Sequence, residues 1–365
     1  MAKRIGILTS GGDCPGLNAA IRGVARAAYV RMENVEIVGI AGGYSGLING
    51  TYRTMERQEF SGILTLGGTI LGTVRTPFKN MRVIEEDNVD KVASMVRNYE
   101  KMKLDCLCTL GGNGTHKTAN LLAEEGLNVI GLPKTIDNDI WGTDVTFGFH
   151  SAVDIATDVI DRMHTTASSH GRVMVVELMG NKVGWLTLYA GIAGGADVIL
   201  IPEFPFCEEL VTEAVRRRAE RGKAFSIIAV AEGAFRDSDA NLKRRERRVK
   251  MEEMGVRSTA ELITKTIEET TGIETRLVVP GHIQRGGSPS AYDRMLSTKL
   301  GVHAAELINK GRFGYTVAMK GDELTENKLS DVAGKTKSVP KDAALVRTAV
   351  SMGISLGRQA KEING

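Results

Sequence analysis

Cysteine, net charge and long apolar runs are all scarce in this sequence. The four cysteines form no C-x-x-C pair and no histidine cluster joins them, so the sequence offers no zinc site and fits a reduced cytoplasmic setting. The net charge of +3 is too small to argue for nucleic acid. No apolar run approaches the roughly 20 residues that cross a bilayer. We therefore expect a cytoplasmic protein with no nucleic-acid or membrane partner.

The composition is that of an ordinary globular protein. Hydrophobic residues make up 42% and charged residues 25% of the 365 residues, and this length suits two α/β domains. Basic runs occur at residues 216–218 and 243–248. We interpret both as solvated helix faces rather than a binding patch, because an anionic substrate would use single, placed cations.

Apolar strands alternate with amphipathic helices along the chain. This β-α-β order predicts parallel sheets with helices on both faces. No low-complexity linker divides the chain, so a second domain must be inserted or interleaved. The expected strands are residues 5–9, 35–40, 105–110, 128–132, 172–178, 198–202, 225–231 and 275–279, and the clearest helices are residues 19–29, 89–100 and 118–125.

Glycine is abundant, at 42 residues, and it falls where the expected strands end. Residues 9–20 (T-S-G-G-D-C-P-G-L-N-A-A) and 110–115 (L-G-G-N-G-T) both read as a strand, a glycine turn and a helix start. Free backbone N–H groups at a helix start favour phosphate, and glycine lets phosphate come close. Two such turns could hold successive phosphates of a nucleotide. The alternative for the second is a tight turn with Asn113 and Gly114 at positive φ.

Two further motifs carry charged side chains. Asp137 and Asp139 end an expected buried strand in residues 131–139 (G-L-P-K-T-I-D-N-D). Burying two carboxylates costs free energy, which suggests that they have a function. One can serve as a general base and the other as a magnesium ligand, although an ordinary polar turn remains an alternative. In residues 280–289 (P-G-H-I-Q-R-G-G-S-P), His282 and Arg285 could grip a phosphate.

Together the four motifs resemble the phosphofructokinase family in order and spacing. The resemblance runs from about residue 3 to about residue 309, and the last fifty or so residues match weakly. The joint occurrence of P-K-T-I-D-N-D and G-H-I-Q-R-G-G is highly specific. Four shorter segments also match: residues 72–76 (G-T-V-R-T), 168–172 (S-S-H-G-R), 176–180 (V-E-L-M-G) and 231–233 (A-E-G).

The resemblance implies a magnesium-dependent kinase that transfers a phosphoryl group from ATP to the 1-hydroxyl of fructose 6-phosphate. Asp137 would be the general base, supported by Thr135 and Asp139. Asn113 and Asp139 would lie near magnesium. The nucleotide phosphates would be held by Gly11, Gly12, Arg75, Thr76, Gly112, Asn113, Gly114 and Thr115. The acceptor would be bound by Thr135, Ile136, Asp137, Arg172, Met179, Gly180, Asn181, Glu232, Arg276, His282 and Arg285.

The resemblance also implies two similar Rossmann-like domains with the active site in the cleft between them. We expect a nucleotide-binding domain of residues 1–145 plus 280–322 and a sugar-phosphate-binding domain of residues 146–279 plus 323–365. In this family the counterparts of Arg172 and Arg276 are typically supplied across a subunit contact. The resemblance therefore implies a homodimer or homotetramer.

The sequence departs from the family pattern at the donor site. Gly114 is typical of members that use ATP, whereas Lys134 is typical of members that use pyrophosphate. We weigh Gly114 more heavily, because a carboxylate at this position would repel the α-phosphate of ATP. Asn113 stands where the family usually has Asp, so the protein should hold magnesium less tightly.

Three alternatives stay open. The first is a pyrophosphate-dependent enzyme with the same acceptor, and the second is a kinase for another sugar phosphate, such as sedoheptulose 7-phosphate. The third is a catalytically silent sensor that binds a nucleotide or a sugar phosphate, for which Asn113 is the support. Intact Asp137 and Asp139 speak against the sensor.

Overall fold

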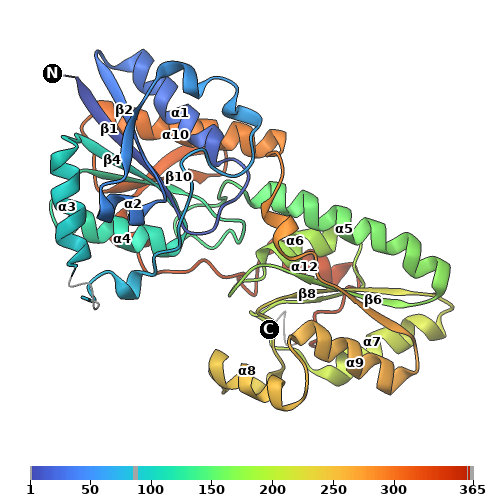
Figure 1. Cartoon of the computed structure of the whole chain (residues 1–365). Coiled ribbons are helices and arrows are strands. Elements are labelled where there is room, and N and C mark those ends of the chain that lie inside the picture. Colours follow the sequence, from blue (N-terminus) through green and yellow to red (C-terminus); the bar gives the residue numbers. More distant parts are fainter. Residues whose placement is uncertain (1, 85–88, 360, 362–365) are drawn as a thin grey trace. The chain divides into compact units, whose positions relative to one another are not determined.

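The computed structural model describes residues 2–84, 89–359 and 361 (Figure 1). The chain forms two compact units, which are considered one at a time. The first comprises residues 1–151 and 285–337, and the second comprises residues 152–284 and 338–365. Residues 323–337, which the sequence suggested for the second domain, lie in the first unit, because strand β11 pairs with strand β10 there.

The first unit is built on a seven-stranded sheet with the order β11-β10-β5-β4-β1-β2-β3. Its five central strands are parallel, whereas β3 and β11 are antiparallel edge strands. Parallel strands place their carboxyl ends at one edge of a sheet, where ligands bind in open α/β folds. The strands are β1 (Lys3–Ser10), β2 (Val35–Ile40), β3 (Tyr52–Met55), β4 (Cys106–Gly111), β5 (Val129–Pro133), β10 (Tyr315–Lys320) and β11 (Glu323–Lys328).

Helices cover both faces of this sheet (Figure 1). They are α1 (Leu17–Arg31), α2 (Tyr44–Asn49), α3 (Lys91–Lys101), α4 (Asn113–Glu124), α10 (Ala291–Asn309) and α11 (Leu329–Val332). Helix α4 begins at Asn113 and not at residue 118 as expected, so it starts directly at the glycine turn. The glycine lowers helix propensity there, but packing against the sheet overrides propensity.

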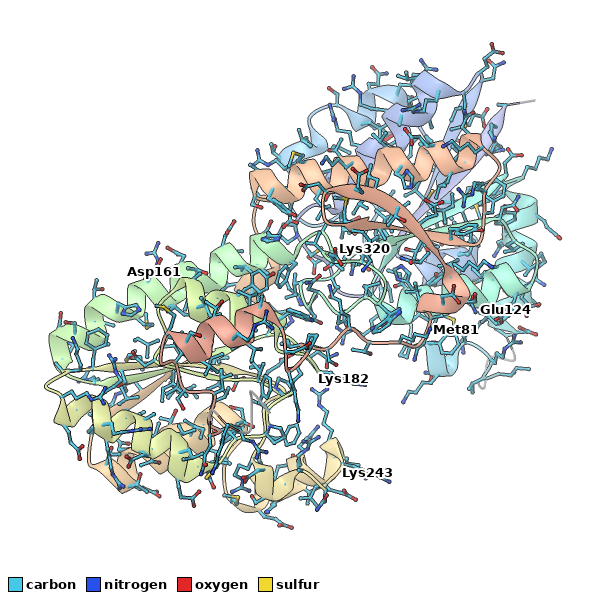
Figure 2. All side chains as sticks on the ribbon, turned by 180° about the vertical axis from the view of Figure 1, so that it is seen from behind. Met81, Glu124, Asp161, Lys182, Lys243 and Lys320 are labelled. Atoms are coloured by element: carbon cyan, nitrogen blue, oxygen red, sulfur yellow. The ribbon has the colours of Figure 1, made fainter. Side chains whose placement is uncertain are left out.

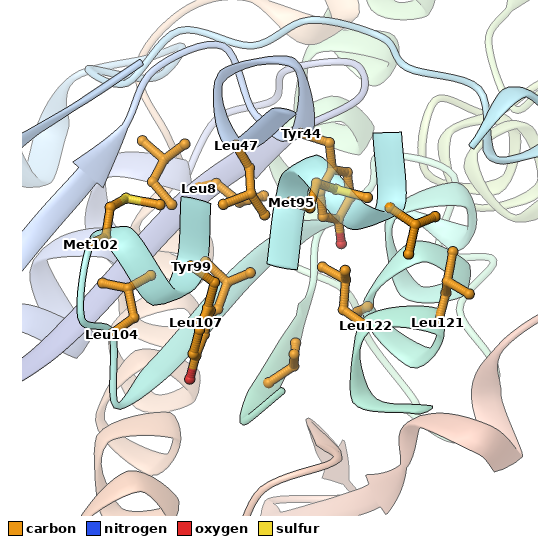
Figure 3. Close-up of a cluster of buried hydrophobic side chains, with 14 of the residues drawn as sticks. Leu8, Tyr44, Leu47, Met95, Tyr99, Met102, Leu104, Leu107, Leu121 and Leu122 are labelled. Carbon is orange, nitrogen blue, oxygen red and sulfur yellow. The ribbon is translucent and has the colours of Figure 1, made fainter. Parts of the chain in front are cut away.

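The core on one face of the first sheet shows why these segments fold together. Apolar side chains of α2, α3 and α4 meet those of β1, β2 and β4 in a buried cluster that includes Leu8, Tyr44, Met95, Leu107 and Leu122 (Figure 3). Burial of each such side chain contributes about 1.5–3 kcal/mol. This packing fixes the strand ends from which the site residues extend.

The second unit has a smaller, fully parallel sheet with the order β7-β8-β6-β9. The strands are β6 (Val173–Leu178), β7 (Val198–Leu200), β8 (Ser226–Ala231) and β9 (Thr275–Val278). The helices are α5 (Phe149–His170), α6 (Trp185–Ala193), α7 (Glu208–Glu220), α8 (Arg244–Glu253), α9 (Thr259–Thr271) and α12 (Ala344–Ser351). The prediction of two α/β units with mainly parallel sheets is thus confirmed. Among the described residues, no helix combines the length and hydropathy needed to cross a membrane.

Candidate active site

The first glycine turn joins β1 to α1 in the first unit. Gly11 has a φ of 86°, a left-handed conformation that glycine adopts readily. The Thr73 hydroxyl donates to the Gly11 carbonyl at 2.7 Å, which ties the following segment, with the exposed Arg75, to the turn. A Cβ atom on Gly12 would lie 2.4 Å from a guanidinium nitrogen of Arg285. Glycine at this position therefore lets a cation approach the turn closely.

Two buried or half-buried cations lie at this turn. The Lys134 ammonium donates to the Gly12 carbonyl, and the Arg285 guanidinium donates to the Asp13 carbonyl at 3.2 Å. Burial lowers the pKa of Lys134. Neighbouring Cys14 is fully buried, and this burial raises the pKa of its thiol to about 12. The thiol is therefore unreactive and contributes to packing. The turn thus carries positive charge where a phosphate would approach.

The second glycine turn joins β4 to α4 and adjoins the first. The Thr115 hydroxyl donates to the Ser10 carbonyl at 3.3 Å, and a Cβ on Gly111 would lie 2.1 Å from the Thr115 hydroxyl oxygen. Helix α4 starts directly after Gly112, and among the described residues no side chain caps its first N–H groups. Such an arrangement binds phosphate. Asn113 and Gly114 have no positive φ, so the tight-turn alternative is wrong.

Gly114 differs from the other glycines of these turns. A Cβ atom there would meet nothing within 4 Å. Packing within the chain therefore does not require glycine at this position. The open space beside the helix start is available to a ligand.

The expected catalytic residues follow β5 in the same unit. The Asp137 N–H donates to the Thr135 hydroxyl at 3.0 Å, and the Thr146 hydroxyl donates to the Thr135 carbonyl at 2.8 Å. Asp137 is 8% exposed, and Ile136 is fully buried. Asn138 has a φ of 53°, and its side-chain oxygen accepts from the Thr146 N–H at 3.1 Å. These bonds hold the loop that carries the two carboxylates.

Asn113 and Asp139 meet between the second glycine turn and this loop. The Asn113 side-chain amide donates to Asp139 Oδ2 at 3.1 Å. Within residues 2–84, 89–359 and 361, the buried Oδ1 of Asn113 has no hydrogen-bond partner. Burial raises the pKa of Asp139, and the Asn113 amide opposes that rise. One carboxylate and one orphaned amide oxygen are ligands that suit Mg²⁺ held jointly with phosphates.

The expected acceptor residues of the second unit end their strands on one edge of its sheet. Gly180 has a φ of 146° and Asn181 a φ of 53°, so a sharp turn follows β6. The Asn181 N–H donates to the Glu232 carboxylate at 2.8 Å, and the Met179 N–H donates to the Gln284 side chain at 3.2 Å. Gln284 was not singled out from the sequence, although it lies inside the G-H-I-Q-R-G-G motif.

Arg172 and Arg276 lie at the other end of the same strands. Arg172 precedes β6, and Arg276 pairs with Met174 near its start. Both guanidinium groups bind the Glu274 carboxylate, Arg172 at 2.6 Å. From Arg172 to Met179 the chain is extended over about 23 Å, at about 3.3 Å per residue. Arg172 and Met179 of one chain therefore cannot hold the same small ligand.

The remaining expected residues are placed as follows. Thr76 is half-buried near Arg75, and His282 is exposed. The division between the units falls between Gln284 and Arg285, so His282 belongs to the second unit and Arg285 to the first. The guanidinium of Arg285 binds the first glycine turn, and its predicted role at the sugar phosphate stays a prediction.

Comparison with known proteins decides the family. Residues 4–308 match the phosphofructokinase family model. The chain belongs to the phosphofructokinase family. It is 54% identical over 358 residues to an ATP-dependent 6-phosphofructokinase of Spirochaeta thermophila, covering 97% of this chain and 98% of that protein.

Other members of the phosphofructokinase family are also similar to this chain. A pyrophosphate–fructose 6-phosphate 1-phosphotransferase of Amycolatopsis methanolica is 45% identical over 340 residues, covering 93% of this chain and 97% of that protein. The T-state phosphofructokinase of Pichia pastoris superposes with a TM-score of 0.80 at 31% identity. The comparison covers 98% of this chain and only 38% of the yeast chain, so this chain spans about two fifths of its length.

Lys337 was not singled out from the sequence, and it lies beyond residues 4–308 of the family match. The Lys337 ammonium donates to Asn138 Oδ1 at 3.0 Å and to the carbonyls of Thr143 and Asp144 at 2.9 Å and 2.8 Å. The backbone N–H of Lys337 also donates to the backbone carbonyl of Asp139 at 2.9 Å. Burial lowers the pKa of Lys337 to about 8. Lys337 thus binds the loop that carries Asp137 and Asp139 at Asn138 and on both sides of it.

Proposed function

We propose that this protein is a 6-phosphofructokinase that transfers the terminal phosphoryl group of ATP to the 1-hydroxyl of fructose 6-phosphate. The products are fructose 1,6-bisphosphate and ADP, as in glycolysis. The observation that carries the proposal is the meeting, within one unit, of two glycine turns and the loop of Asp137 and Asp139. Near full-length identity of 54% to an ATP-dependent relative supports it.

In the proposed reaction Asp137 accepts the proton of the acceptor's 1-hydroxyl. The hydroxyl oxygen then forms a bond to the γ-phosphorus of ATP, and the bond from that phosphorus to the bridging oxygen breaks, releasing ADP. Such reactions depend on positioning and charge neutralisation more than on covalent chemistry. Lys134 and Arg285 supply positive charge at the first turn, and the N–H groups at the start of α4 supply donors to phosphate oxygens.

Magnesium fits this arrangement as a partner of the nucleotide. Asp139 and the orphaned amide oxygen of Asn113 are the residues that would hold it. When bound, Mg²⁺ neutralises phosphate charge and orients the transferring group. Because Asn113 carries no charge, we expect the phosphates to contribute much of the binding.

Gly114 favours ATP as the donor. The space beside its Cα is open, so the remainder of a nucleotide can pass the helix start. A carboxylate projecting there would place negative charge against the α-phosphate, and such like-charge contacts cost several kcal/mol. Pyrophosphate has no further group to accommodate.

A pyrophosphate-dependent reaction with the same acceptor is the second candidate. Lys134 lies at the first turn, where it can bind either donor. The Amycolatopsis methanolica relative named for pyrophosphate is 45% identical to this chain. Overall similarity therefore does not separate the two donors as sharply as the residue at position 114 does.

The placement of Arg172 and Arg276 supports a homo-oligomer, as a homodimer or homotetramer. They lie at the opposite end of the sheet from Met179 and Glu232. We propose that both arginines bind the 6-phosphate of a fructose 6-phosphate held by a neighbouring subunit. A cytoplasmic location follows from the proposed glycolytic role.

The experiment that tests the donor is a steady-state assay on fructose 6-phosphate with magnesium, comparing ATP with pyrophosphate. For Gly114→Asp we expect kcat/KM for ATP to fall about 100-fold or more, since repulsion of several kcal/mol opposes binding. Gly114→Asn is the matched control, because its side chain has the size of aspartate without the charge, and it should lose less ATP activity than Gly114→Asp.

Each outcome of this assay separates the candidates. Activity with ATP alone supports the proposed kinase, and activity with pyrophosphate alone replaces it with the reversible enzyme. If neither donor works while fructose 6-phosphate still binds, the silent-sensor alternative is favoured. An unchanged response to ATP in Gly114→Asp would remove position 114 as the determinant.

A further inference from the structure

A large cavity in the second unit lies beside helix α8 and outside the donor site, and its lining includes Asn181 and Glu232 of the expected acceptor residues. Its volume is about 820 Å³, within the size range of small-molecule sites. Residues at the ends of β6 and β8, helix α8 and the start of α9 line it. Figure 2 shows Lys182, which lines the cavity, and Lys243, at the start of α8, on the same side of this unit.

The charges that line this cavity are strongly unbalanced. Two carboxylates contribute, those of Glu177 and Glu232. Three times as many cations face them: Lys182, Arg244, Arg245, Arg247, Arg248 and Arg257. The basic run at residues 243–248, interpreted from the sequence as a solvated helix face, therefore faces a cavity along most of its length.

Partners within the chain satisfy only some of these cations. Arg248 pairs with Glu252 at 2.9 Å, and Arg244 donates to the Asn181 side-chain oxygen at 2.8 Å. The guanidinium of Arg247 lies 3.7 Å from the centre of the Phe235 ring. In the part of the chain that the structure describes, a buried nitrogen of Arg247 has no hydrogen-bond partner. A buried, charged donor without an acceptor is costly and calls for an anion.

The opposite wall strengthens this conclusion. The buried Oε2 of Glu177 has no hydrogen-bond partner among the described residues. Burial raises the pKa of Glu177, a hydrogen bond with Ser258 partly opposes that rise, and the charge of Glu232 adds to it. Because burial disfavours the charged form of Glu177, this carboxyl group neutralises the arginines less than an exposed carboxylate would.

We propose that the α8 side of this cavity binds a small polyanion, either a phosphate ester or a polycarboxylate, beside the fructose 6-phosphate that Asn181 and Glu232 hold in the proposed function. Planar guanidinium groups bind both phosphate and carboxylate oxygens in pairs, which suits either ligand. The stacked, preoriented guanidinium of Arg247 is the central contact. Arg244 reaches from the cavity to Asn181 in the acceptor turn, so the ligand shares a wall with that turn.

The test is calorimetric titration of the full-length protein at low salt with saturating fructose 6-phosphate. Two probes distinguish the ligand types: 3-phosphoglycerate for a phosphate ester and tricarballylate for a polycarboxylate. We expect at least one probe to bind while fructose 6-phosphate is present. Arg247→Gln should weaken that binding about 10-fold or more, as expected for a lost charge-assisted bond of 1.5–3 kcal/mol.

Arg217→Gln is the matched control, because Arg217 is an exposed arginine of α7 that pairs with Glu213 and lies outside the cavity. It should bind the probe as the wild type does. Arg245→Gln provides a second cavity variant if Arg247→Gln fails to fold by circular dichroism. The proposal is overturned if neither probe binds, if fructose 6-phosphate abolishes binding, or if cavity and control variants lose affinity equally.

Discussion

The two units treat their functional residues in opposite ways. In the first unit, hydrogen bonds join the two glycine turns, and Asn113 links the second turn to Asp139 on the catalytic loop. In the second unit, the acceptor residues divide between the two ends of a parallel sheet, about 23 Å apart along β6. In one chain, the expected donor and base residues therefore lie together, whereas the expected acceptor residues lie at two separate places.

Under the proposed residue roles, the parallel sheet of the second unit serves two sites, one at each end of its strands. The turns at the carboxyl ends of the strands suit a ligand of the same subunit, as in other open α/β sheets. We propose that Arg172 and Arg276, at the opposite end of the strands, serve a neighbouring subunit. Glu274, which binds both Arg172 and Arg276, holds them ready at that end.

The largest effect expected is the loss of the base in the first unit. Asp137→Ser should lower kcat by about 10²–10⁴-fold, because general base catalysis is lost, while KM for both substrates changes little. Asp322→Ser, which removes an exposed carboxylate at the β10–β11 turn, is the control. Steady-state kinetics check this, and retained turnover in Asp137→Ser would show that another group takes the proton.

Mixing variants tests the divided acceptor residues directly. Arg276→Ala should raise KM for fructose 6-phosphate about 10- to 100-fold, because a charge-assisted contact with phosphate is lost. If neighbouring subunits exchange arginines, dissociating and mixing Arg276→Ala with Asp137→Ser restores about a quarter of wild-type activity in a dimer, since each mixed dimer holds one intact site. Separate samples of either variant are the controls. No recovery after subunit exchange would place both groups in one subunit's site.

Lys337 tests how firmly the first unit holds its loop. Lys337→Met should lower kcat about 10- to 100-fold, because small displacements of catalytic groups have effects of this size. In the wild type, kcat should fall above pH 8, because the ammonium group of Lys337 then loses a proton and can donate only two of its three hydrogen bonds. Lys337→Arg, which stays charged, should shift that decline to higher pH.

Stability should change with pH in the opposite direction, which separates this effect from unfolding. The pKa of Lys337 is lowered from 10.5 to about 8 by burial, and the facing groups are Asp139, Asp144 and Lys320. Between these pH values the unfolded chain binds more protons, so the Lys337 contribution to the free energy of unfolding rises with pH. Urea denaturation at pH 7.5 and 9.5, compared with Lys337→Met, measures it. A parallel fall in stability and kcat would contradict the local explanation.

The central fold was readable from the sequence because its strands are buried on both faces. Continuous apolar runs located β1, β2, β4 and β5 to within two residues at each end. The same strand ends located the glycine turns and the loop of Asp137 and Asp139. The hairpin of β10 and β11 was missed, since β11 is a polar edge strand without an apolar run.

The remaining site residues depend on contacts between distant segments, which one sequence does not reveal. Lys337 lies 200 positions from Asp137 and beyond the family match, and its type and spacing carry no signal. Arg244 belongs to the basic run of residues 243–248, and basic runs of this kind usually form solvated helix faces. Only the fold brings Arg244 into contact with Asn181. Gln284 was detectable, because it lies between two residues that were already assigned roles.

The place of β10 in the first sheet has a practical consequence for protein engineering. A gene trimmed to the family match would end at residue 308, before β10 and β11. Strand β5 would then become the sheet's edge, and the backbone N–H and C=O groups of its buried, apolar residues Val129–Pro133 would be open to pairing with another chain. Exposed edges of this kind promote aggregation. Expression trials of shortened versions should therefore retain at least residue 337, even though the recognisable family signature ends earlier.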